Sequence, residues 1–152
     1  MGREWVLFLC THNSARSQMA EGLLRHLAGD RFVALSAGTV ATAVRPQAIE
    51  VMREIGIDIA RHESKTLERY LGEPLDLVIT VCDDANEACP IFPGSHERLH
   101  WSFEDPSRAT GSPEEQLVVY RRVRDEIRAR MERELLGRPP SERSERRVLG
   151  QS

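Results

Sequence analysis

The sequence predicts an α/β protein: a single three-layer domain in which a four-stranded parallel sheet is flanked by helices. Short apolar runs without polar alternation are typical of strands that are buried on both faces. Segments with apolar residues at helical spacing separate these runs, and strands that alternate with helices form parallel sheets. The 152 residues suffice for one domain with a hydrophobic core.

The first half of the chain supplies two strands and two helices. Residues 6–9 form the first strand, and residues 19–27 repeat apolar side chains at helical spacing, which predicts the first helix. Residues 32–35 form the second strand, and we expect a turn at residues 36–38 to close it. A second helix begins at Pro46, because proline is favoured in the first helical turn.

The second half continues the alternation. Residues 75–81 are the third and strongest strand, and residues 99–103 form a short fourth strand. Residues 114–136 carry one apolar stripe and form a long last helix. Because no apolar periodicity follows, we expect one domain over residues 1–136 and a flexible tail over residues 137–152.

Composition narrows the class of protein. The formal net charge of -3 gives no reason to expect nucleic-acid binding. No apolar run approaches the ~20 residues that span a bilayer, and the N-terminus does not resemble a signal peptide. Three cysteines without paired short spacings argue against a disulfide framework and against a structural zinc site. We therefore expect a soluble, cytoplasmic monomer without a metal site.

The junction between the first strand and the first helix carries the chemistry. Cys10 ends the strand, and Arg16 and Ser17 follow after five residues. Backbone N–H groups of such a loop converge on one point, so the loop can hold an oxyanion beside a reactive thiolate. The candidate oxyanion-binding residues are Thr11, His12, Asn13, Ser14, Ala15, Arg16 and Ser17. Taken alone, Cys10 would be interpreted as a small buried hydrophobe.

Three further residues belong near this loop. Cys82 follows the third strand, so the topology brings it to the same sheet edge as Cys10. Cys89 lies seven residues later, about 10 Å along a helix, whereas a disulfide requires Cα atoms within about 7 Å. A helical segment between them would therefore have to unwind before the sulfurs could bond. Asp105 precedes Pro106 and is either a general acid or simply the start of a turn.

Together these motifs resemble the thioredoxin-coupled arsenate reductases, which have the low-molecular-weight protein tyrosine phosphatase fold. The resemblance covers roughly residues 5–136 and depends most on Cys10-x5-Arg16-Ser17, Cys82 with Cys89, and Asp105-Pro106. It implies that Cys10, Cys82, Cys89, Arg16 and Asp105 are catalytic, with arsenate as substrate and thioredoxin as reductant. It also implies that phosphate and sulfate compete for the loop, and that no metal or organic cofactor is needed.

Two positions depart from the family pattern. Many relatives have a second cysteine in the loop, where this chain has Ala15. Some relatives hold a potassium ion beside the loop with residues equivalent to Asn13, Glu21 and Ser36 and an acid, where this chain has Lys65. Our hypothesis is that the Lys65 ammonium replaces the ion.

The sequence is compatible with other functions. The same loop and Asp105 would serve a phosphatase acting on tyrosine phosphate or small aryl phosphates, although Ser107 and Arg108 stand where protein phosphatases carry tyrosines. A reductase coupled to glutaredoxin would not need Cys89. A non-enzymatic oxyanion or redox sensor would not need Asp105.

Overall fold

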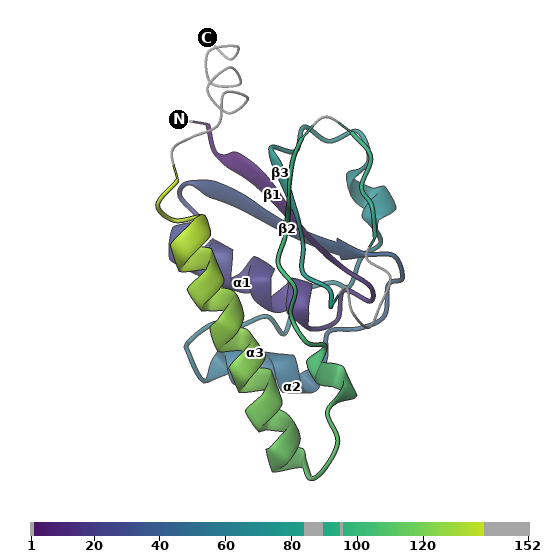
Figure 1. Ribbon diagram of the computed structural model, residues 1–152, viewed down its shortest axis with the longest axis vertical. Helices are drawn as coiled ribbons and strands as arrows, with labels where there is room; N and C mark the ends of the chain where they lie inside the picture. The colour runs from purple at the N-terminus through teal and green to yellow at the C-terminus, as the bar shows by residue number, and fades with distance from the viewer. Residues whose placement is uncertain (1, 84–89, 95, 139–152) are drawn as a thin grey trace.

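The structure, a computed structural model, describes residues 2–83, 90–94 and 96–138, and all structural statements concern those residues (Figure 1). Its elements follow the order β1 (Glu4–Cys10), α1 (Arg16–Ala28), β2 (Phe32–Gly38), α2 (Pro46–Arg53), η1 (Leu67–Tyr70), β3 (Leu77–Thr80), β4 (Glu97–His100), η2 (Pro106–Arg108) and α3 (Pro113–Glu134). None of the described helices is both long and apolar enough to cross a membrane.

The four strands form one parallel sheet in the order β2-β1-β3-β4. The predicted fold class is therefore confirmed. Side chains of β1 alternate between two cores, with Val6 and Phe8 on one face and Leu7 and Leu9 on the other. Because both faces are buried, the strand is apolar at nearly every position.

The three α-helices share the larger core, and the shorter η1 segment packs against the smaller one. Figure 1 shows α1 lying between the sheet and the long α3. The apolar stripe predicted for α3 is buried along its length: Leu117, Tyr120, Val123, Ile127, Met131 and Leu135. This helix begins with a capping box in which Ser112 and Glu115 bond each other's backbone amides.

All four strand predictions were wrong at their ends: β1 extends beyond the predicted residues 6–9, and β3 is shorter than the predicted residues 75–81. Residues 36–38 are the last part of β2 and not a closing turn, because Ser36 and Gly38 pair with Phe8 and Cys10. The fourth strand is Glu97–His100, which begins two residues before the predicted segment 99–103 and ends three residues before the end of that segment. It lies at the sheet edge and exposes polar side chains, so no run of apolar residues marks its position in the sequence.

The end of the predicted domain is tied to the fold. Arg31 donates to the carbonyls of Leu136 and Arg138, at 2.6 and 2.9 Å. Arg138 in turn donates to the Glu97 carboxylate at 2.6 Å. The predicted tail starts at residue 137, but residues 139–152 lie outside the described residues, so its flexibility stays a prediction.

Candidate active site

Cys10 ends β1, is 2% exposed and is a free thiol. Its Sγ lies 2.8 Å from the Oγ of Ser17 in the first turn of α1. The amide of Asn13 donates to the same Oγ at 2.8 Å. The Ser17 hydroxyl is therefore oriented to donate its own proton to a Cys10 thiolate.

The orientation of Asn13 is fixed from its other end. Its Oδ1 accepts from the backbone N–H of Lys65 at 2.8 Å and from the Gln18 amide at 2.9 Å. Asn13 has a φ of 50°, a left-handed conformation that asparagine adopts more readily than most residues. Ser36 does not hold Asn13 in place, because it donates to Glu21 instead.

The carbonyl groups of the loop are turned toward the surrounding scaffold. The acceptors and their donors are Thr11 with Thr39 and Val40, His12 with Thr42 and Ser64, Asn13 with Gln18, and Ser14 with Arg45. A trans peptide places each carbonyl opposite the next N–H group. The amides of His12, Asn13, Ser14 and Ala15 therefore face away from the scaffold, and within the described chain none of them donates to another residue. Such converging donors suit a tetrahedral oxyanion.

Gly38 allows this loop to lie against β2. A Cβ there would stand 2.7 Å from the Thr11 carbonyl oxygen, 2.9 Å from the Asn13 nitrogen and 3.0 Å from the Cys10 carbonyl oxygen. All three are backbone atoms, so no side-chain rotation could relieve the contact. The close approach requires glycine at this position.

Arg16 and Asp105 meet at the loop. Arg16 is buried, and its Nη2 lies 3.5 Å from the Asp105 carboxylate, while its Nη1 donates to the Phe103 carbonyl at 3.3 Å. Asp105 accepts from the hydroxyl and the backbone N–H of Ser107, at 2.7 and 3.0 Å. Sequence reasoning missed Ser107, although a serine two residues after an aspartate is a recognisable turn-capping pattern. A carboxyl group is thus held beside the arginine that would bind the oxyanion.

Behind the loop lies a buried charge cluster around Glu21. Its carboxylate accepts from Ser36 at 2.6 Å and from Arg25 at 2.9 Å. His62 Nδ1 and Lys65 Nζ each lie 3.5 Å from it. Burial lowers the pKa of Lys65 and of His62, and the charge of Glu21 partly opposes both shifts.

Lys65 is the single lysine of the chain. Its ammonium also donates to the Glu63 carbonyl at 2.7 Å and lies 3.5 Å from the Ser36 hydroxyl. The Lys65 ammonium therefore already provides the positive charge that a potassium ion would bring to Glu21 and Ser36. The residues present do not fit an additional cation there.

Cys82 is buried and follows β3 at the same sheet edge as Cys10. The ladder between β1 and β3 pairs Leu9 with Thr80, and Val81 donates to the Leu9 carbonyl at 2.8 Å. The expected proximity of the two strand ends is thus found. Cys82 is disulfide-bonded, whereas Cys89 lies outside the described residues.

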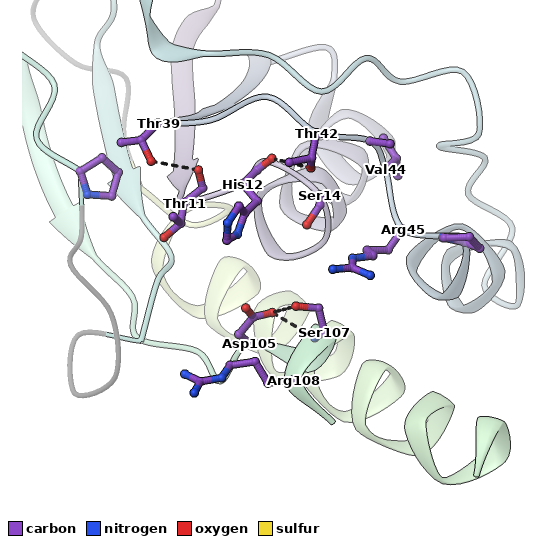
Figure 2. A pocket seen from close by; sticks show the side chains of 13 residues that line it. Thr11, His12, Ser14, Thr39, Thr42, Val44, Arg45, Asp105, Ser107 and Arg108 are labelled. Carbon is purple, nitrogen blue, oxygen red and sulfur yellow. Dashed lines mark hydrogen bonds between the residues drawn. The ribbon is translucent and has the colours of Figure 1, made fainter. Parts of the chain in front are cut away.

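A pocket of about 1130 Å³ opens in front of the loop (Figure 2). Its lining includes Thr11, His12 and Ser14 of the loop and Asp105 opposite them. His12 is exposed at this mouth and was not expected to be catalytic. The described residues hold no cluster of three or more His, Cys, Asp or Glu that could bind a metal ion.

Residues 5–139 match the family model of low molecular weight phosphotyrosine protein phosphatases. The chain belongs to this family. The proteins similar to this chain include enzymes that are named for another activity. An arsenate reductase of Halalkalibacterium halodurans is 47% identical over 131 residues, which cover 86% of this chain and 94% of that protein.

Solved structures agree with this assignment of fold. An arsenate reductase in the phosphate binding state has a TM-score of 0.68 and 33% identity, covering 86% of this chain and 95% of that one. The thioredoxin-dependent arsenate reductase of Corynebacterium glutamicum has a TM-score of 0.63 and 29% identity, covering 90% of this chain and 64% of that one. The resemblance to thioredoxin-coupled arsenate reductases, which the sequence motifs indicated, is confirmed.

Proposed function

We propose that this protein reduces arsenate to arsenite with three cysteines and is regenerated by thioredoxin, in the cytoplasm and as a monomer. The observation that carries the proposal is the placement of two cysteines at neighbouring strand ends, one in an oxyanion loop. The names of the relatives support arsenate as the substrate and, for one of them, thioredoxin as the reductant. A phosphate-bound relative supports phosphate as a competitor, and sulfate has the same tetrahedral shape.

The first step joins sulfur to arsenic. Arsenate binds to the amides of the loop and to the Arg16 fork, with the Cys10 thiolate beneath it. The thiolate attacks arsenic, and an oxygen leaves as water after taking a proton from Asp105. The Ser107 hydrogen bonds hold Asp105 in position for this transfer.

The second step moves two electrons. The Cys82 thiolate attacks the Cys10 sulfur, the sulfur–arsenic bond breaks, and its electron pair reduces arsenic(V) to arsenic(III). Arsenite leaves, and a disulfide joins Cys10 and Cys82. Cys89 then attacks Cys82 and releases the Cys10 thiolate, and thioredoxin reduces the remaining disulfide.

Hydrolysis of aryl phosphates is the second candidate function, favoured by the family match and by a pocket larger than arsenate. The variant Cys82→Ser separates the two candidates. We expect it to release no arsenite from arsenate, measured by chromatography and elemental mass spectrometry, while it hydrolyses 4-nitrophenyl phosphate at the wild-type rate. Full arsenite production by this variant would contradict the proposal. Wild-type protein that hydrolyses the phosphate but never reduces arsenate would identify a phosphatase.

A further inference from the structure

The pocket in front of the loop is much larger than one tetrahedral oxyanion. Its volume is about 1130 Å³, whereas at about 30 Å³ for each oxygen a four-oxygen anion fills roughly 120 Å³. Thr11, His12 and Ser14 of the oxyanion loop line its inner end. The outer part is therefore large enough for an organic group attached to the oxyanion.

Two arginines line this outer part from different elements. Arg45 precedes α2, and Arg108 belongs to η2 on the opposite side of the pocket (Figure 2). Arg45 N–H donates to the Ser14 carbonyl at 2.9 Å, and Arg108 N–H donates to the Asp105 carbonyl at 3.2 Å. Each backbone is therefore anchored directly to a residue of the candidate site.

The charges of these two side chains are not neutralised by neighbours. Both arginines are exposed, and within the described part of the chain neither guanidinium has a hydrogen bond or an ion pair. Arg121, by contrast, pairs with Glu54 at 2.8 Å. Asp105 is the one acid among the described lining residues, and it already contacts Arg16 and Ser107. The outer pocket therefore carries net positive charge.

The wall beside the arginines is apolar and rigid. Val44 and Pro46 flank Arg45 in sequence, and Pro90 lines the same pocket. Prolines and a branched aliphatic side chain offer a surface for a flat carbon framework. The outer pocket thus combines an apolar wall with two planar cations.

We propose that Arg45 and Arg108 form a second anion-binding subsite, so that the pocket binds phosphate monoesters whose organic part carries a further carboxylate or phosphate. The ester phosphate lies in the oxyanion loop, the carbon framework lies against Val44 and Pro46, and the second negative group reaches the arginines. Guanidinium groups suit this task because they bind planar carboxylates and phosphates through paired donors. This binding does not depend on arsenate reduction.

The test compares two esters that differ by one charged group, phenyl phosphate and 4-carboxyphenyl phosphate. Their dissociation constants are measured by calorimetry on the full chain carrying Cys10→Ser, which prevents turnover. We expect the carboxylated ester to bind about two- to 30-fold more tightly, the range for two solvent-exposed ion pairs. In the added double variant Arg45→Gln/Arg108→Gln this preference should vanish, while inorganic phosphate binds as before.

A matched control has the same loss of net charge elsewhere. Arg53→Gln/Arg61→Gln removes two exposed arginines that do not line the pocket, so the preference should persist. Equal binding of the two esters by the parent protein would overturn the proposal. So would a preference that survives in the Arg45/Arg108 variant. Failure of arsenate reduction would leave these binding results unchanged, so the two proposals fail separately.

Discussion

Gly38→Ala is the sharpest test of how the oxyanion loop is held. The added Cβ would stand 2.7 Å from the Thr11 carbonyl oxygen, where ordinary contact begins at 3.4 Å. The loop backbone would have to retreat by about 0.7 Å, and a misplacement near 1 Å at a reacting centre can cost roughly 100-fold in rate. We therefore expect kcat/KM for arsenate to fall by about ten- to 100-fold.

The same variant should lose stability. Overpacking of this kind costs about 1–3 kcal/mol, and each kcal/mol lowers Tm by about 2–4 °C in a chain of this size. The assays are arsenate-dependent NADPH oxidation with thioredoxin and thioredoxin reductase, and thermal melting. Gly137→Ala is the control, because no atom lies within 4 Å of its added Cβ. Wild-type kcat/KM in Gly38→Ala would refute the reasoning.

Three more predictions follow from the site. With Cys82 and Cys89 changed to Ser, Ser17→Ala should slow alkylation of Cys10 by iodoacetamide at least roughly tenfold, because a hydrogen bond to a thiolate contributes about 1.5–3 kcal/mol; an unchanged rate would exclude that bond. Replacing NaCl by KCl should leave the activity and Tm of the wild type unchanged but raise both in Lys65→Asp, and a potassium-activated wild type would contradict the role of Lys65. Burial lowers the pKa of His62 below 6.5. On acidification its imidazole is therefore protonated in the unfolded chain before it is protonated in the folded chain, and the free energy of unfolding declines below about pH 6.5. His62→Gln should show a flatter decline in urea unfolding than the wild type, and parallel curves would refute this contribution.

The sequence predicted the site best where one short segment carries it. The Cys10-to-Arg16 spacing indicates the oxyanion loop because strand, loop and helix are contiguous. The support for that loop comes from far along the chain, as in the Ser64 hydroxyl that bonds the His12 carbonyl. Such contacts depend on tertiary packing, so spacing alone could not reveal them.

Strand ends were the least predictable part of the fold. Ser36 and Gly38 read as a turn, yet parallel pairing with β1 keeps them extended. The edge strand β4 begins with Glu97 and Arg98, whose exposed side chains carry no apolar signal. In both cases the partner strand determines the conformation, because strand pairing and not local preference decides it.

The central claim is the three-cysteine relay, and the variant Cys89→Ser tests it most directly. With arsenate, thioredoxin, thioredoxin reductase and NADPH, the wild type should oxidise NADPH continuously. The variant should produce no more than one arsenite per protein molecule and then stop, with Cys10 bonded to Cys82. Continuous turnover by Cys89→Ser at the wild-type rate would contradict the relay.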